Sequence, residues 1–392
     1  MTTPDASQRT LALLIGAIFV VSIDSRVITP ILPAIADDLG VSIGQAGLIV
    51  TAYLLPYGLF QLLYGPVADR VGHVRVVSIA LGGFAVGEGL CAVAPNLGTL
   101  VAFRLVTGIV AAATFPLTLA YIGETVGYDR RQSVIGYTVM AASVGQVLSA
   151  AAGGFLAAIL SWRAIFALDG LIALAITLLM LRTPSARAIQ RREPRPAFAP
   201  YRDVLADRRH LYFYLLIFIE GAFTIGAFSY FGALLRERDG FSYAAIGGII
   251  ALFGATSVVA GRFLGPIARV IGERRMIAIG GAGISACYAM TVVQPAIVVF
   301  PIAMAVLGVA FIIMHSTFQT RATEISPTSR ATGISLFAFA LFLGSSLGAL
   351  LTAQSLDSLG YNETMLILSA ISGLFSIIAA FAIIPWSRPG TA

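Results

Sequence analysis

The sequence predicts an all-α membrane protein of twelve transmembrane helices, arranged as two pseudo-symmetric six-helix bundles. Three observations carry this prediction. The composition is extremely apolar, twelve apolar stretches are long enough to cross a bilayer, and a repeat relates the two halves of the chain. Together they indicate a multi-pass membrane protein of the kind that moves solutes.

The composition excludes a water-soluble domain. Of the 392 residues, 58% are hydrophobic and 11% are charged, whereas globular chains hold about 45–50% apolar and about 25% charged residues. No soluble fold has enough interior to bury that much apolar surface. The two cysteines, Cys91 and Cys287, form neither a disulfide pattern nor a metal-binding pattern. We therefore expect a lipid-embedded protein without metal or cofactor.

Twelve mostly apolar stretches have about the 20 residues that a helix needs to cross a bilayer. Backbone groups in hydrocarbon must bond within their own segment, so the stretches are expected to be helices. They are residues 11–34, 45–65, 76–94, 98–122, 133–158, 163–181, 210–235, 243–268, 276–294, 297–321, 331–355 and 363–385.

The arginines predict the orientation of these spans. If the N-terminus is cytoplasmic, eighteen of the 25 basic residues fall on the cytoplasmic side, three on the opposite side and four within spans. Short loops rich in basic residues stay in the cytoplasm. The expected location is therefore the cell inner membrane, with both termini cytoplasmic.

A polar, arginine-rich stretch divides the chain. Residues 1–181 are expected to form the N-terminal bundle, 182–209 a cytoplasmic linker and 210–392 the C-terminal bundle. The sequence GPVADRVG at 65–72 has a counterpart, GPIARVIG, at 265–272. Internal duplication is typical of secondary transporters that move two bundles about a central site.

The segment 52–72, AYLLPYGLFQLLYGPVADRVG, ends in a loop with regularly spaced glycine and charged residues. They are Gly65, Asp69, Arg70 and Gly72, followed by His73, Val74 and Arg75. In these residues the chain resembles the major facilitator superfamily, and within it the twelve-helix drug:proton antiporters. The resemblance implies the major facilitator fold and a gating loop, in which Asp69 pairs with an arginine or caps a helix in one conformation only. An Asp–Arg pair that only fixes topology is the alternative.

Arg104 and Gly108 resemble a motif on the family's fourth helix, although Thr107 replaces the expected Gln. The resemblance assigns Arg104 to proton transfer. A charge at this depth requires a carboxylate or backbone carbonyls as partner. A static buried pair remains the alternative.

The fifth expected helix carries glycines at the spacing found in the family's exporters: Gly136, Gly145, Gly153 and Gly154. Ser149-Ala150 stands where the exporters have Gly-Pro, so one kink determinant is missing. Small residues allow close helix contact. The motif favours export, and packing without meaning for direction is the alternative.

Ionisable residues inside the spans are candidates for function. On a helical wheel Asp24 and Arg26 point to opposite sides of the first helix. The resemblance favours Asp24 for proton coupling, whereas the wheel favours Arg26 as the residue facing the cavity. Both stay open.

On the seventh expected helix the wheel places Phe213, Glu220, Thr224 and Phe231 on one face, as expected for an aromatic and polar cavity lining. His315 could relay protons, but a bond to neighbouring backbone is the commoner role. Further carboxyls, Glu88 and Asp169, could pair with either buried arginine.

These features predict a proton-coupled antiporter that exports amphipathic organic compounds by alternating access, driven by the proton gradient. A sugar or small-metabolite porter is the alternative, and a non-transporting sensor a remote one. No catalytic cluster predicts an enzyme. The expected partners are a small-molecule substrate, protons and membrane lipids, with no nucleic acid, and the protein is expected to act as a monomer.

Overall fold

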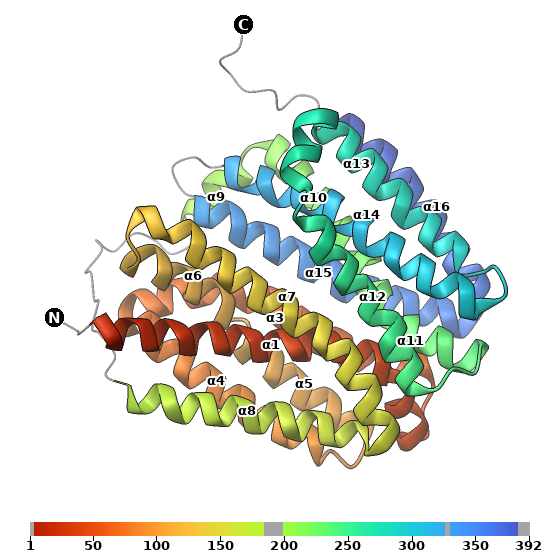
Figure 1. Ribbon diagram of the computed structural model, residues 1–392, viewed down its shortest axis with the longest axis horizontal. Helices are drawn as coiled ribbons and strands as arrows, with labels where there is room; N and C mark the ends of the chain where they lie inside the picture. Colours follow the sequence, from red (N-terminus) through yellow and green to blue (C-terminus); the bar gives the residue numbers. More distant parts are fainter. Residues whose placement is uncertain (1–3, 184–198, 326–329, 383–392) are drawn as a thin grey trace, which may run out of the picture.

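The computed structural model describes residues 4–183, 199–325 and 330–382, and within them the chain is almost entirely helical. Figure 1 shows two bundles packed against each other, with the red to olive helices below and the green to blue helices above. The all-α fold class predicted from the sequence is confirmed.

The N-terminal half contains α1 (Pro4–Leu39), α2 (Ile43–Ala46), α3 (Leu48–Val71), α4 (His73–Ala92), α5 (Leu97–Ala111), α6 (Thr114–Thr125), α7 (Tyr128–Ile159) and α8 (Trp162–Arg182). The C-terminal half contains α9 (Ala199–Leu205), α10 (Arg208–Gly221), η1 (Ala222–Gly226), η2 (Ala227–Tyr230), α11 (Phe231–Ala233), η3 (Leu234–Arg238), α12 (Tyr243–Gly261), α13 (Leu264–Met290), α14 (Ala296–Glu324), α15 (Arg330–Leu359) and α16 (Tyr361–Ala382). Much of the expected linker, residues 184–198, lies outside the described residues.

Eleven described segments are long and apolar enough to cross a membrane. The twelfth expected span corresponds to α13, whose first half carries Arg269, Glu273, Arg274 and Arg275. Because of these charges α13 is not apolar enough to be counted among the eleven segments. Its part after Gly272 is nevertheless long enough to cross a membrane. The count of twelve helices therefore agrees with the fold.

The expected spans 243–268 and 276–294 have different boundaries in the structure. α12 ends at Gly261, and α13 begins at Leu264 and continues through a kink at Gly272. Hydropathy alone missed this arrangement because residues 264–268 are apolar and prolong the apolar run of α12.

The sequence repeat is also a backbone repeat. Equivalent turns contain glycines with positive φ: Gly40 (65°) with Gly240 (71°), and Gly72 (101°) with Gly272 (73°). Glycine adopts this conformation without the steric penalty of other residues. Ser42 and Ser242 cap the following helices in the same way, each accepting a hydrogen bond from a backbone N–H three residues later. The offset of 200 becomes 199 at the next pair, because α5 begins at Leu97 and α14 at Ala296.

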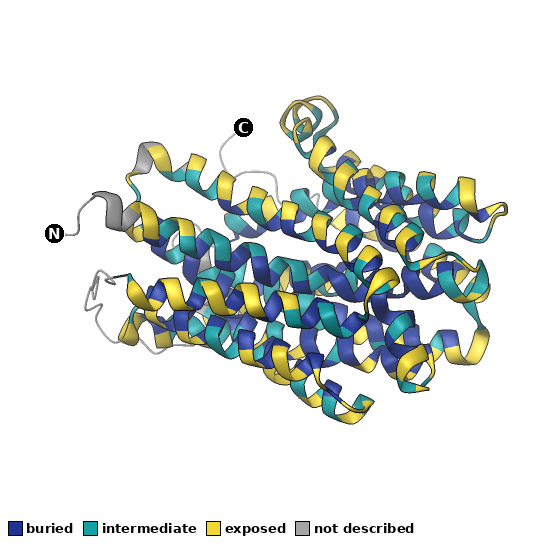
Figure 2. Ribbon diagram, turned by 60° about the horizontal axis from the view of Figure 1, so that its bottom comes forward, coloured by how far each residue is buried: buried dark blue, intermediate teal, exposed yellow. Residues whose placement is uncertain are grey.

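Each half has its own apolar core, and the outer faces of the helices are apolar as well. Figure 2 shows buried residues along the inside of the bundles and exposed residues on their outer sides. Many of these exposed residues are large and apolar, among them Leu171, Val270, Leu374 and Phe381. Such a surface is suited to lipid rather than water.

The halves meet mainly along two helix pairs, α7 with α12 and α3 with α15, and α1 adds contacts to α11, η2 and α12. Near the end that carries the Gly40 and Gly240 turns, the hydroxyl of Tyr243 donates a hydrogen bond of 2.9 Å to Asp37 of α1. Near the other end, a Cβ added to Gly65 or Gly136 would meet nothing within 4 Å. The described contacts thus hold the halves together most firmly at the Gly40 end.

Candidate functional site

Arg104 of α5 lies in the core of the N-terminal half, between carboxyls from two other helices. Its Nη1 atom is 2.5 Å from Oδ1 of Asp24 on α1 and 3.3 Å from Oε1 of Glu88 on α4. The guanidinium also lies over the ring of Tyr53, 4.2 Å from its centroid. All three charged side chains are 1% exposed or less. Arg104 is therefore a fully buried cation held by two carboxyls.

A third carboxyl belongs to the same region. Asp169 of α8 is 5% exposed, and both of its oxygens lack a hydrogen-bond partner among the described residues. One oxygen of Asp24 and one of Glu88 are likewise buried without a partner. Three carboxyls and one guanidinium lie in this region, and two of the carboxyls contact the guanidinium, so full ionisation would leave a net charge of −2. We call Asp24, Glu88, Arg104 and Asp169 the carboxyl cluster.

Arg26 leaves α1 on a different side from Asp24, as the helical wheel predicts. It is 9% exposed, and its Nε atom donates a long hydrogen bond of 3.4 Å to the side-chain oxygen of Gln146 on α7. Its guanidinium lies 5.0 Å from the ring centroid of Phe228 and 5.4 Å from that of Phe253. Both rings belong to the C-terminal half, so Arg26 spans the interface between the halves.

A small cavity connects the two arginines. Its walls include Arg26 and Thr29 of α1, Tyr53 of α3, Arg104 of α5 and Ser229 of η2. Its volume is about 10 Å³, roughly that needed for one water molecule. This cavity is too small for an organic substrate, so binding of one here would require the surrounding helices to move apart.

The seventh membrane segment does not present the expected face to this cavity. Phe213 packs against Phe318, and Phe231 stacks on Tyr288, inside the C-terminal core. The hydroxyl of Thr224 donates 2.6 Å to the backbone oxygen one turn earlier. These side chains are buried, and the wall of the described cavity comes instead from Ile225 and Ser229.

A change of helix type follows Phe213 and Glu220, which lie in the regular helix α10, and it alters the directions of the residues after them. The segment becomes a π-helix over η1 and a 3-10 helix over η2. A π-helix bonds i to i+5 and a 3-10 helix i to i+3, so a constant 100° per residue no longer assigns faces correctly. Broken helices next to a central site are common in transporters.

Glu220 of α10 pairs with His315 of α14. The distance between Oε1 of Glu220 and Nδ1 of His315 is 3.0 Å, and Glu220 is fully buried. The imidazole stacks on Phe311, with centroids 4.8 Å apart. The backbone bond that the sequence favoured for His315 is replaced by this carboxyl. Sequence reasoning named both residues but had no signal that they touch.

The gating-loop residues lie at the end of α3 and the start of α4. Asp69, Arg70 and Arg75 are exposed, and none forms an ion pair with a described side chain. Gly72 supplies the turn between the helices, and nothing crowds Gly65. The conformation-dependent pair expected for Asp69 is therefore not formed with any described residue.

The glycines of the export-like motif lie on α7 and differ in their surroundings. A Cβ on Gly145 would lie 2.7 Å from the backbone oxygen of Phe19, and one on Gly153 2.8 Å from Val27, both on α1. A Cβ on Gly154 would lie 2.7 Å from Cα of Gly247 in the other half. Gly136 has no such neighbour.

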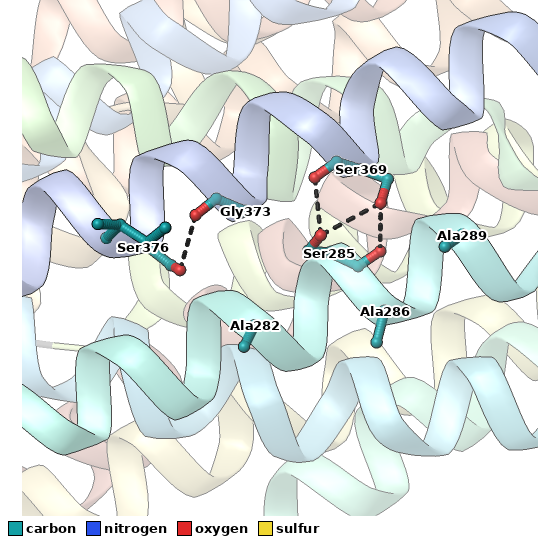
Figure 3. A pocket seen from close by; sticks show the side chains of 8 residues that line it. Ala282, Ser285, Ala286, Ala289, Ser369, Gly373 and Ser376 are labelled. Atoms are coloured by element: carbon teal, nitrogen blue, oxygen red, sulfur yellow. Dashed lines mark hydrogen bonds between the residues drawn. The ribbon is translucent and has the colours of Figure 1, made fainter.

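A larger hollow lies on the outside of the C-terminal half, between α13 and α16 (Figure 3). Ser285 and Ser369 face each other there, and each hydroxyl donates to the other residue's backbone oxygen at 2.7 and 2.8 Å. The serines thus satisfy each other and fasten two helices together.

Comparisons with known proteins agree with this architecture. A family model described as Major Facilitator Superfamily matches residues 14–349. The uncharacterized MFS-type transporter YceJ of Bacillus subtilis (strain 168) is 26% identical over 343 residues, which are 86% of this chain and 86% of YceJ. The fatty acid resistance protein FarB of Neisseria gonorrhoeae is 29% identical over 164 residues, 41% of this chain and 32% of FarB.

Among solved structures, the crystal structure of the nucleoside transporter NupG matches with a TM-score of 0.80 at 14% identity. The match covers 97% of this chain and 100% of NupG. At this identity the likeness concerns the fold alone.

Proposed function

Because this chain belongs to the Major Facilitator Superfamily, we propose that it is a proton-coupled antiporter that exports amphipathic organic compounds by alternating access. The family and its structural neighbours are membrane transporters, so the chain is a multi-pass transporter and not an enzyme. The observation that carries the proposal is the carboxyl cluster, which lies directly beside a cavity between the halves.

The cluster supports proton binding because it contains more carboxyls than it has positive charge to match. A buried carboxylate without a partner takes up a proton rather than remain charged in a low-dielectric interior. Asp169, whose two oxygens are both buried without a hydrogen-bond partner among the described residues, is such a group. A proton gained or lost by the cluster changes the charge around Arg104, and this change would weaken or strengthen the Asp24–Arg104 ion pair.

α1 provides a physical link between proton binding and the substrate cavity. Asp24 faces Arg104 inside the N-terminal half, while Arg26, two residues later, faces Gln146 and the other half. A shift of α1 that accompanies breaking of the Asp24–Arg104 bond would therefore move Arg26 as well. Coupling in this scheme runs through a shared helix and does not require proton and substrate to share one group.

The proposed direction of transport and the proposed orientation in the membrane each have one support. The name of FarB refers to resistance to fatty acids, which is consistent with export of amphipathic compounds. The arginine bias favours cytoplasmic termini in the inner membrane, and the Gly40 end, where the halves are held together, then faces outwards. The present conformation corresponds to the inward side of the transport cycle, with the Asp69 loop in the cytoplasm.

The first test is growth of a hypersensitive bacterium that expresses the protein, across a panel of toxic amphipathic compounds, with and without a proton uncoupler. We expect protection against a subset of compounds, and loss of that protection with the uncoupler. The second test reconstitutes the purified protein into liposomes that contain a pH-sensitive dye. Addition of a compound from that subset should move protons.

The informative variant is Asp24→Asn, with Asp203→Asn as its control, because Asp203 is 70% exposed on α9 outside the spans. We expect Asp24→Asn to abolish compound-triggered proton movement and Asp203→Asn to leave it unchanged. Normal proton movement in Asp24→Asn would remove Asp24 from the mechanism. Protection that an uncoupler does not affect would rule out proton coupling altogether.

A further inference from the structure

We propose that the transported compounds are amphipathic organic anions, whose acidic group is bound by Arg26 and whose apolar part lies against Phe228 and Phe253. The inference rests on the proposed transport function and adds the charge of the substrate, which that function leaves open.

The first support is that Arg26 has no acidic partner among the residues that the structure describes. No described carboxylate lies within 4 Å of its guanidinium, and its one hydrogen bond runs from Nε to the neutral side chain of Gln146. Arg26 is nevertheless buried, with only 9% of the residue exposed. A buried arginine inside a membrane protein is normally paired. The two terminal nitrogens of Arg26 therefore offer an unused fork of donors, which matches the geometry of a carboxylate, sulfonate or phosphate.

The second support is the contrast with Arg104, which lines the same cavity. Arg104 is matched by Asp24 and Glu88 at 2.5 and 3.3 Å. Of the two arginines at the cavity, only Arg26 has an uncompensated charge. The carboxylate that the sequence placed in the cavity, Glu220, is turned towards His315 and is fully buried, so it does not give the cavity a negative site for a cation.

The third support is the apolar surface beside Arg26. The rings of Phe228 and Phe253 lie 4.7 Å apart, and Phe311 continues the surface 5.5 Å from Phe253. A guanidinium over aromatic rings gains cation–π attraction, which is weaker than a hydrogen-bonded ion pair. The rings thus contact the guanidinium of Arg26 while no substrate is bound. When the acidic group of a substrate binds the guanidinium, the rings can instead contact the hydrocarbon part of that substrate.

The position of Arg26 at the interface means that a bound anion would contact both halves. Arg26 belongs to α1 of the N-terminal half, while Phe228 of η2 and Phe253 of α12 belong to the C-terminal half. An amphipathic anion bound to all three would replace the direct contact between the halves with a bridge through the substrate. A ligand that contacts the halves differently in each conformation is the requirement for driving alternating access.

The test compares two probes with the same ten-carbon tail and permanent charges of opposite sign, 1-decanesulfonate and decyltrimethylammonium. Both are used below the concentrations at which they form micelles. Binding to the protein in lipid nanodiscs is measured by titration of intrinsic fluorescence, and proton movement is measured separately in liposomes. We expect decanesulfonate to bind at least tenfold more tightly than decyltrimethylammonium.

Arg26→Gln should lose at least tenfold in affinity for decanesulfonate, whereas Arg26→Lys, which keeps the charge but not the fork, should lose less. Arg262→Gln is the control, because Arg262 is an exposed arginine at the end of α12 and does not line the cavity. If Arg26→Gln does not fold, Arg26→Lys still tests the proposal. An unchanged affinity of Arg26→Lys for decanesulfonate, together with tight binding of decyltrimethylammonium, would overturn the proposal.

The two readouts separate this inference from the proposed function. Arg26-dependent binding of decanesulfonate without proton movement would support the anion site and contradict proton coupling. Proton movement triggered by decyltrimethylammonium but not by decanesulfonate would support coupling and overturn the anion site. Equal affinity of Arg26→Gln and the unchanged protein for decanesulfonate would also overturn it.

Discussion

Asp24 and Arg26 lie two residues apart on α1 and serve opposite sides of it: Asp24 bonds Arg104 in the core of the N-terminal half, and Arg26 contacts Gln146 and two rings across the interface. A single turn of one helix therefore joins the carboxyl cluster to the interface between the halves. The predictions below probe the two sides of this turn and the contacts around it.

Removing the charge of Arg104 should destabilise the protein. Arg104→Gln leaves Asp24 and Glu88 buried without their cation, and breaking a buried pair costs about 3–5 kcal/mol. The midpoint of unfolding in detergent should fall accordingly. The double variant with Asp24→Asn should recover part of the loss, because one of the unmatched charges is gone. Strictly additive losses would show that the two side chains do not interact.

Asp169→Asn should behave differently from Arg104→Gln. Neither oxygen of Asp169 has a hydrogen-bond partner among the described residues, so the substitution breaks no pair. We expect a change in stability of no more than about 1 kcal/mol, the scale of a single hydrogen bond. The number of protons moved per transported compound should fall, as measured with the pH-sensitive dye. A large loss of stability would instead mean that the aspartate has a structural partner.

The Glu220–His315 pair should behave as one unit. Glu220→Gln retains an oxygen that can accept a hydrogen bond from the imidazole, so we expect it to be milder than His315→Ala. Residues in contact typically show coupling of about 0.5–3 kcal/mol in a double-mutant cycle. Unfolding of the two single variants and the double variant measures it. If Glu220 contacts a cationic substrate instead, Glu220→Gln would selectively reduce export of cations.

Two glycines of α7 offer a matched pair of substitutions. Gly154→Ala places a methyl group against Gly247 of α12, where a Cβ would be 2.7 Å from Cα, whereas Gly136→Ala meets open space. Alanine is otherwise preferred in a helix by about 1 kcal/mol. We expect Gly154→Ala to lower the transport rate at least tenfold and Gly136→Ala to leave it unchanged. Equal rates would mean that close contact of α7 and α12 is not needed in the cycle.

Asp69 should act in the conformation opposite to this one. It has no ion pair with a described side chain here, so Asp69→Asn should not harm the present state but should remove a contact from its alternative. We expect slow transport and longer average distances between spin labels on the loop-side ends of α3 and α15. Arg70→Gln, at the neighbouring exposed position, is the comparison. Unchanged distances and transport would reduce Asp69 to a topology signal.

The sequence predicted the fold class because the fold class depends on composition, span length and a repeat, which are properties of the chain alone. It predicted the family from the resemblance of residues 52–72 to the family's loop motif. The family and the all-α membrane fold are confirmed. The error at α12 and α13 arose because an apolar run does not reveal where a helix ends and the next one begins. The roles expected for the site residues and the division into two domains remain predictions.

Within the site, the wheel gave the opposite directions of Asp24 and Arg26 on α1, but a constant 100° per residue does not hold along the seventh segment. α1 keeps regular α-helical geometry around Asp24 and Arg26, whereas η1 and η2 break it between Glu220 and Phe231. Partners on other helices were beyond the sequence: nothing local determines that Arg104 meets Asp24 and Glu88, or that His315 meets Glu220. Such pairs depend on which helices are neighbours in space.

The matching turns at Gly40 and Gly240 and at Gly72 and Gly272 imply descent of both halves from one ancestral segment, and they make positions in the halves directly comparable. The buried ionisable residues are not repeated at equivalent positions of the two halves. The positions equivalent to Asp24, Glu88, Arg104 and Asp169 hold Thr224, Tyr288, Ala303 and Leu368, and those equivalent to Glu220 and His315 hold Val20 and Pro116. Each half thus carries buried ionisable residues at positions where the other half has uncharged ones, so the shared backbone does not determine where charge lies in the membrane.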